Sequence, residues 1–181
     1  KNAFLLGFFW GIVFFYPAIS WLNSIALAAT IGLVLYLSLY FAAFAVICRG
    51  GFQTRPCLPA FAKAVFLASA WTVLEYIRSN FLTGFGWVLL GYSQSSFLPA
   101  IQIADITGVY GVSFVVVFVN AAIYEFFFAN AKSANVGENR DTSHFSTRIS
   151  CRKMGCVPIF PCVFLIAIVF SYGFYKLRPS S

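Results

Sequence analysis

The amino-acid sequence predicts an all-α integral membrane protein, a polytopic helical bundle of about five transmembrane helices with one folded or re-entrant loop. Hydrophobic residues make up 61% of the 181 residues and charged residues only 9%, whereas a soluble domain carries about 25% charged residues on the surface that faces water. Uncharged runs of about 20 residues, the length that crosses a bilayer as a helix, follow one another along the chain. These observations exclude a soluble globular protein.

The first two predicted spans come from one continuous stretch, residues 2–48, that carries no charged side chain. This stretch is long enough for two bilayer-spanning helices, and we place the break between them near residues 21–24 (WLNS). The spans are then residues 3–22 and 26–48. Neither run alternates between polar and apolar residues as a barrel strand would, so we expect helices.

Three further spans follow. The third begins near Pro59 and runs to Arg78, the fourth comprises Ile106–Tyr124, and the fifth comprises Val157–Tyr175. Between the third and the fourth, residues 79–104 carry no charge but contain three glycines and a proline. Unpaired backbone amides are costly in lipid, so we expect this segment to fold at the membrane interface or to re-enter the bundle.

The Lys and Arg residues predict the orientation of the chain. Nine of the twelve are Lys1 or belong to residues 49–63 and 130–156, and the other three are Arg78, Lys176 and Arg178. The positive-inside rule places the nine in the cytoplasm, and the glycine-rich loop, residues 80–105, then faces the opposite side together with the C-terminus. Because the basic residues lie between apolar runs, the net charge of +7 does not indicate a nucleic-acid partner.

We expect three regions along the chain: a transmembrane bundle over residues 1–130, a basic cytoplasmic loop over residues 131–156, and a last helix with its tail over residues 157–181. The chain begins with Lys1 and lacks the pattern of a signal peptide. We interpret it as a fragment of a longer protein or as the product of a truncated gene.

No catalytic residue, metal site or cofactor is predicted within this chain. The five cysteines lack metal-binding C-x-x-C spacing, and no Walker loop, zincin motif or G-x-S-x-G occurs. Ionisable groups inside a span are costly and demand a reason, which makes Glu75 and Arg78 the residues of interest. They share one helical face. They either form an ion pair that fixes the adjacent loop or act directly on a ligand.

Other polar residues of the spans are assigned structural roles. Glu125, at the end of the fourth span, is interpreted as an interfacial charge. A polar stripe on the fourth helix is expected to serve helix packing rather than binding. Trp87 and Tyr92 suit the depth of the membrane interface. The stripe consists of Tyr110, Ser113, Asn120 and Tyr124.

The segment over residues 71–94, WTVLEYIRSNFLTGFGWVLLGYSQ, resembles the hallmark of apolipoprotein N-acyltransferases. That family shows W-x-x-x-E-(F/Y)-(L/I)-R, then T-G-F-P-W, then G-Y-S-Q. Residues 108–114 and 119–120 resemble the family's next helix, and residues 7–11 and 36–40 resemble its earlier spans, so the similarity covers about residues 3–130. One departure is Gly86, which stands where the family usually has Pro and makes that turn less rigid.

The resemblance implies a bacterial inner-membrane enzyme with a phospholipid acyl donor and a diacylated apolipoprotein acceptor, whose N-terminal diacylglyceryl-cysteine becomes N-acylated. It further implies a Cys thioester, a Glu base and a Lys in a periplasmic nitrilase-like domain, which we expect in cis beyond this chain. The fragment would then supply the membrane anchor and the lipid-docking scaffold, with its loop and C-terminus in the periplasm. The candidates on the lipid side are Glu75, Arg78, Trp87, Tyr92 and Gln94.

Two alternatives stay open at this stage. The chain could be an inactive truncated scaffold, or it could be a subunit of a small membrane transporter. Transporters of this kind are typically built from inverted repeats with paired broken helices. The sequence contains one broken segment and no visible repeat, which favours the acyltransferase interpretation.

Overall fold

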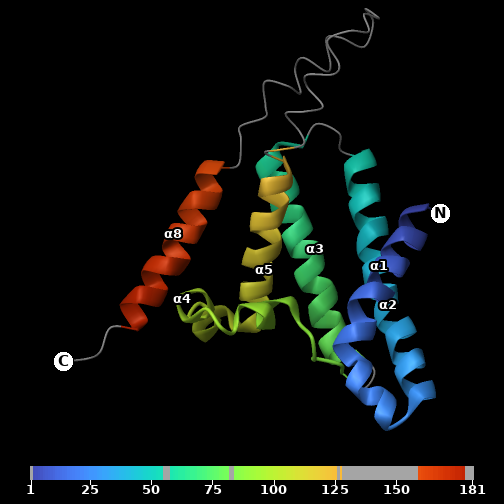
Figure 1. The fold of residues 1–181 in the computed structure, drawn as a ribbon. Helices are drawn as coiled ribbons and strands as arrows, with labels where there is room; N and C mark the ends of the chain where they lie inside the picture. Colours follow the sequence, from blue (N-terminus) through green and yellow to red (C-terminus); the bar gives the residue numbers. More distant parts are fainter. Residues whose placement is uncertain (1, 55–57, 82–83, 126, 128–158, 178–181) are drawn as a thin grey trace, which may run out of the picture. The chain divides into compact units, whose positions relative to one another are not determined.

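The computed structural model describes residues 2–54, 58–81, 84–125, 127 and 159–177, and this part of the chain is helical without a strand. The all-α fold class is therefore confirmed. Figure 1 shows the elements in chain order. They are α1 (Asn2–Ile19), η1 (Ser20–Ser24), α2 (Leu27–Thr54), α3 (Ala60–Asn80), η2 (Leu90–Gln94), α4 (Leu98–Ile101), α5 (Ala104–Tyr124) and α8 (Ile159–Lys176).

Four helices in the described part of the chain are long and apolar enough to cross a membrane: Asn2–Ser24, Leu27–Gly51, Ala60–Asn80 and Ala104–Tyr124. They coincide with the first four predicted spans to within a few residues. The apolar helix α8 lies where the fifth span is predicted. The predicted basic loop, residues 131–156, lies outside the described residues, and the three expected regions of the chain stay predictions.

The chain divides into two compact units, and the division passes through α3. Unit 1 comprises Lys1–Pro56 and Val73–Val88, and unit 2 comprises Cys57–Thr72 and Leu89–Ser181. Each unit has its own hydrophobic core, so each is described by itself below.

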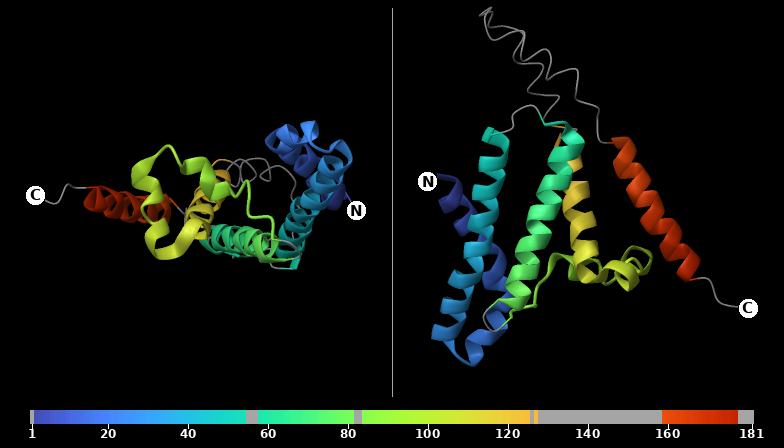
Figure 2. Two further views of the ribbon diagram at one scale, coloured as in Figure 1. Left: turned by 90° about the horizontal axis from the view of Figure 1, so that it is seen from below. Right: turned by 180° about the vertical axis from the view of Figure 1, so that it is seen from behind.

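In unit 1, α1 and α2 lie side by side and run in opposite directions (Figures 1 and 2). Their backbones approach closely at two glycines of α1. A Cβ atom added to Gly7 would lie 2.7 Å from the Cβ atom of Ala45, and one added to Gly11 would lie 2.7 Å from the Cα atom of Ser38. Small residues spaced four apart allow this kind of close packing between membrane helices. Beyond the glycines, Phe15, Ile19, Val34 and Leu37 form the core.

In unit 2, the first part of α3 packs against the second half of α5. Ala64 and Ala68 of α3 contact a group on α5 that contains Phe118, Ala121 and Ala122. At the end of this contact, Lys63 Nζ lies 3.4 Å from the carboxylate of Glu125, whose side chain is only 8% exposed. Glu125, which the sequence predicts to be an interfacial charge, is therefore a buried carboxylate that pairs with Lys63.

The segment that joins α3 to α5 is folded, as predicted. It contains η2 and α4, and α8 packs on it through two contacts. The rings of Phe97 and Phe170 lie 5.4 Å apart, and Gly173 lies against the backbone of Pro99 so closely that a side chain would not fit there. The loop thus carries helical structure of its own and serves as a packing surface for α8.

Candidate functional site

A first candidate site, within unit 1, is formed by Arg78, which is only 3% exposed at the end of α3. Its Nη2 donates a hydrogen bond to the carbonyl oxygen of Val88 at 3.1 Å. Its own carbonyl oxygen accepts a hydrogen bond from the amide of Phe85, also at 3.1 Å. The guanidinium lies over the ring of Phe15, 5.2 Å from its centroid, a cation–π distance. Arg78 therefore binds the loop through both its backbone and its side chain.

The loop that Arg78 holds has an unusual backbone at Val88. This residue has a φ of 56°, in the left-handed region that β-branched residues rarely adopt. Such a conformation costs on the order of 1–3 kcal/mol and persists only where its surroundings hold it in place. The hydrogen bond from Arg78 to the Val88 carbonyl is one such restraint. The sequence does not predict this conformation, because a valine ordinarily has a negative φ.

Glu75 lies one turn before Arg78 and is equally buried, at 3% exposure. A buried charge in a membrane segment needs compensation, and the shared helical face keeps Arg78 as its predicted partner. Two phenols of α2 add polar groups to unit 1. The hydroxyls of Tyr36 and Tyr40 lie 2.7 Å apart.

Trp87 of the loop stacks on Trp21 of η1, with ring centroids 5.5 Å apart and an interplanar angle of 27°. Both indoles are more than half exposed, as expected of side chains that sit at a membrane interface. The interfacial position of Trp87 stays a prediction, and its partner was not predicted, because Trp21 lies in a different turn of the chain. The two turns of unit 1 thus meet through a pair of indoles.

A second candidate site, described by itself, lies in unit 2, where η2 is fixed to α5. The amide of Gly91 donates a hydrogen bond to Ser113 Oγ at 2.8 Å. A Cβ atom at residue 91 would lie 2.6 Å from the carbonyl oxygen of Val109, so only glycine fits this contact. Ser113, for which a role in helix packing was predicted, therefore bonds to the backbone of η2 through Gly91. Tyr92 and Gln94, on either side of Ser93, are exposed and half-buried respectively.

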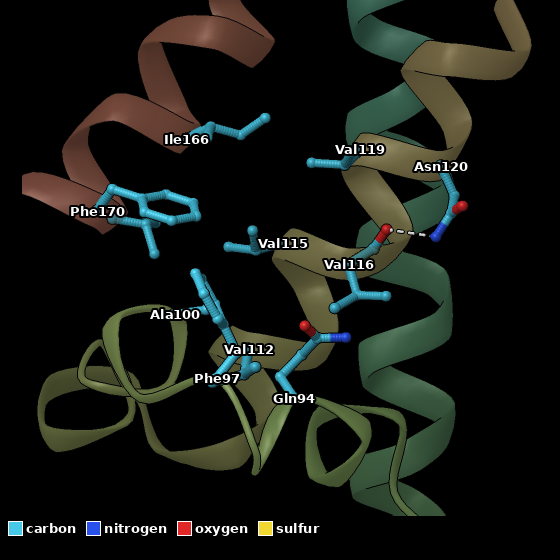
Figure 3. Close-up of a pocket in the computed structure, with 11 residues that line it drawn as sticks. Gln94, Phe97, Ala100, Val112, Val115, Val116, Val119, Asn120, Ile166 and Phe170 are labelled. Carbon is cyan, nitrogen blue, oxygen red and sulfur yellow. Dashed lines mark hydrogen bonds between the residues drawn. The ribbon is translucent and has the colours of Figure 1, made fainter. Parts of the chain in front are cut away.

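A pocket of about 380 Å³ opens beside Gln94. Figure 3 shows four valines of α5 along one wall, side chains of α8 along another and the loop below. Sequence reasoning missed this wall, although the spacing of the valines places them together on α5. The Asn120 amide donates to the Val116 carbonyl of its own helix at 2.9 Å. The lining residues are Gln94, Phe97, Ala100, Val112, Val115, Val116, Val119, Asn120, Ile166, Val169 and Phe170.

The predicted lipid-side residues are thus divided between the units, with Glu75, Arg78 and Trp87 in unit 1 and Tyr92 and Gln94 in unit 2. Among the described residues no three His, Cys, Asp or Glu side chains gather in a way that could hold a metal ion. What the described residues offer is a mostly apolar pocket in unit 2, an exposed pair of indoles in unit 1 and a loop segment that is fixed within each unit. These features suit the binding and positioning of apolar ligands.

Comparison with known proteins places the chain in a family. Residues 1–122 match the family described as apolipoprotein N-acyltransferase N-terminal domain. No solved structure matches the chain.

Three curated relatives, each named apolipoprotein N-acyltransferase, give the degree of similarity. The protein of Geobacter metallireducens is 36% identical over 137 residues, which cover 68% of this chain and 25% of the relative. That of Haemophilus influenzae is 33% identical over 139 residues, 75% of this chain and 26% of the relative. That of Wigglesworthia glossinidia brevipalpis is 29% identical over 186 residues, 97% of this chain and 32% of the relative. The chain therefore spans about a quarter to a third of the length of these relatives, and it belongs to the apolipoprotein N-acyltransferase family through the N-terminal membrane domain.

Proposed function

We propose that this membrane domain serves the N-acylation of bacterial lipoproteins, as the anchor and lipid-docking scaffold of a phospholipid:apolipoprotein N-acyltransferase. The observation that carries the proposal is the match of residues 1–122 to the N-terminal domain of that family. The match also supports a location in the inner membrane, and the excess of Lys and Arg on one side supports a periplasmic position for residues 80–105 and for the C-terminus.

In the proposed reaction an acyl group leaves a phospholipid ester and forms a thioester on a Cys, with release of a lysophospholipid. The acyl group then passes to the α-amino group of the diacylglyceryl-cysteine of the lipoprotein, and the thiol is regenerated. No residue of this chain is assigned to these bond changes. A nitrilase-like domain in cis would supply the nucleophile, and this chain would present the two lipid substrates to it.

The fixed loop supports this division of labour. A group that transfers an acyl chain needs its substrates held in a productive geometry, since misplacement by about 1 Å can cost on the order of a hundredfold in rate. Arg78 holds the first half of the loop through Val88, and Ser113 holds the second half through Gly91. We propose that Trp87 of unit 1 and, separately, Tyr92 and Gln94 of unit 2 contact the lipid substrates.

The test is a chimeric enzyme. The segment of the Geobacter metallireducens relative that aligns with this chain is replaced by the aligned residues of this chain. The chimera is expressed in a bacterium depleted of its own acyltransferase. We expect mass spectrometry of a reporter lipoprotein to show three acyl chains. The same chain expressed alone should leave the reporter with two. A chimera that is present in the membrane at normal level and still yields only diacylated reporter would contradict the proposal.

A further inference from the structure

We propose that the pocket of unit 2 binds one hydrocarbon chain of a membrane phospholipid, as a resident lipid that fills the space between α5 and α8. The inference concerns binding alone and does not require that this lipid be the acyl donor. It rests on the composition of the pocket, on its length and on the position of Gln94, the polar side chain that lines it from the loop.

The walls of the pocket are mostly hydrocarbon, with Gln94 and Asn120 as the two amide side chains among the lining residues. The valines of α5 and the side chains of Ile166 and Phe170 of α8 lie around it (Figure 3), and Val169 of α8 is also part of its lining. The α5 wall belongs to a helix with the length and hydropathy of a membrane span. The solvent around such a helix is lipid, and an apolar cavity does not hold water without two to four polar partners. The occupant that matches these walls is therefore an alkyl chain.

The dimensions of the pocket fit one acyl chain of one leaflet. From Val112 to Val119 the helix rises by about 10 Å at ~1.5 Å per residue, compared with about 15 Å for half of the hydrocarbon core of a bilayer. The volume is about 380 Å³. If a methylene group takes up about as much space as a water molecule, ~30 Å³, the pocket holds about a dozen methylene groups. Two chains would not fit.

The polar side chain at the loop end gives the lipid a direction. Gln94 belongs to η2, in the loop that leads into the first residues of α5. Its amide lies at the edge of the pocket (Figure 3). Its Nε2 donates to Ser93 Oγ at 3.1 Å, and an amide can make further hydrogen bonds through its remaining hydrogen and its oxygen. We therefore place the ester and headgroup of the phospholipid beside Gln94 and the end of the chain toward Ile166.

A lipid in this position would add to the contacts that hold α8. At the loop end α8 already has direct contacts: Phe170 with Phe97, and Lys176 Nζ with Asp105 Oδ2 at 2.8 Å. Phe97 and Phe170 themselves line the pocket, which also reaches Val119 of α5 and Ile166 of α8. A chain that fills it extends the packing between α5 and α8 along both helices.

The experiment uses the full chain in detergent micelles, to which phosphatidylethanolamine with a diazirine in the middle of one acyl chain is added in rising fractions. After illumination, mass spectrometry maps the adducts. We expect adducts on residues 112–119 and 166–170 to saturate as the probe fraction rises, because a single site fills, while adducts elsewhere rise in proportion. Proportional increase at every position would mean bulk lipid only and would overturn the proposal.

Two valines of α8 provide a matched pair of variants. Val169 lines the pocket and is 3% exposed, whereas Val163 is 59% exposed and is not part of its lining. We expect Val169→Trp to lower the saturable adducts about tenfold, a loss of ~1.4 kcal/mol in binding, and Val163→Trp to leave them unchanged. Equal yields in the two variants would overturn the assignment, and the saturation measurement on the unaltered chain decides the matter if Val169→Trp does not fold.

A competition arm distinguishes phospholipid from the acyl chains of a lipoprotein. Unlabelled phosphatidylethanolamine should reduce the saturable adducts in proportion to its excess over the probe. A synthetic diacylated lipopeptide at the same concentration of acyl chains should compete no better than phosphatidylethanolamine does. Stronger competition by the lipopeptide would overturn the choice of phospholipid. Neither result depends on acyl transfer, so the chimera test of the proposed function can fail while this one succeeds.

Discussion

Arg78 carries out several tasks that few other side chains could combine in a membrane span. Its guanidinium is planar, carries five N–H donors and stacks on aromatic rings, and here it binds the Val88 carbonyl while lying over the ring of Phe15. A lysine at this position would keep the charge but would lose the planar group that makes both contacts at once. At the scale of single residues, the geometry of the loop therefore depends on a guanidinium that is 3% exposed.

The predicted pairing of Glu75 with Arg78 can be tested by a double-mutant cycle. Glu75→Gln or Arg78→Gln alone would leave one buried charge uncompensated, at a cost of about 3–5 kcal/mol. The double variant contains no such charge, so we expect its loss of stability to be clearly smaller than the sum of the two single losses. Thermal unfolding of the purified chain in one detergent gives the stability, and strictly additive losses would show that the two residues do not interact.

At the scale of helices, unit 1 depends on the two glycines that let α1 and α2 approach. Membrane helices associate through close packing rather than through the hydrophobic effect, so each added atom at the contact has a direct cost. Gly11 and Gly32 form a useful contrast. A Cβ atom at Gly11 would lie 2.7 Å from the Cα atom of Ser38, whereas one at Gly32 would have no neighbour within 4 Å.

We therefore expect Gly11→Ala to destabilise the chain by about 1–3 kcal/mol, the usual cost of overpacking. Gly32→Ala should be neutral or stabilise it by up to ~1 kcal/mol, because alanine is the better helix former. Both variants add the same methyl group within a helix, and thermal unfolding in the same detergent compares them directly. A loss in Gly32→Ala equal to that in Gly11→Ala would argue against the close contact.

The two ion pairs of unit 2 should differ in importance because they differ in burial. Glu125 is 8% exposed and pairs with Lys63, whereas Lys176 and Asp105 are each 51% exposed. Lys63→Met would leave the Glu125 carboxylate buried without its partner, which costs on the order of 1–3 kcal/mol. Lys176→Met breaks a pair that water and salt already screen. We expect the first variant to unfold at a clearly lower temperature, with little dependence on salt, and a larger effect of Lys176→Met would contradict this ranking.

Much of the element scale could be predicted from the sequence, because each span is a long apolar run whose ends are set by charge, glycine or proline. Residues 21–24, where the first two spans were separated, form the short helix η1 at Ser20–Ser24. The contacts of the candidate site were harder to predict. Two of these contacts join residues from different elements, the Trp21–Trp87 pair and the Gly91–Ser113 hydrogen bond. The left-handed backbone of Val88 is likewise held by a hydrogen bond from Arg78 of α3. Such contacts depend on tertiary packing, which periodicity along one helix does not reveal.

At the scale of the whole molecule, the family motif over residues 71–94 contributes to both compact units. Glu75 and Arg78 belong to unit 1, and Tyr92 and Gln94 belong to unit 2. Each half of the motif is fixed within its own unit, the first by Arg78 and the second by Ser113. The motif therefore does structural work on both sides of the boundary at Val88, and this accounts for its length in physical terms.

The orientation of the molecule is the last prediction, and it follows from the distribution of Lys and Arg: nine residues on one side and three on the other. Ser95 lies in the loop and is exposed, and Ala60 begins α3 at the opposite end from Asn80. In a cysteine-free background, a membrane-impermeant maleimide added to intact spheroplasts should label Ser95→Cys and spare Ala60→Cys. Inside-out vesicles should give the reverse pattern. Because the two positions are joined by a single spanning helix, each serves as the control for the other. Labelling of Ser95→Cys from the cytoplasmic side alone would invert the topology, and it would leave the loop on the wrong side for a periplasmic acyl transfer.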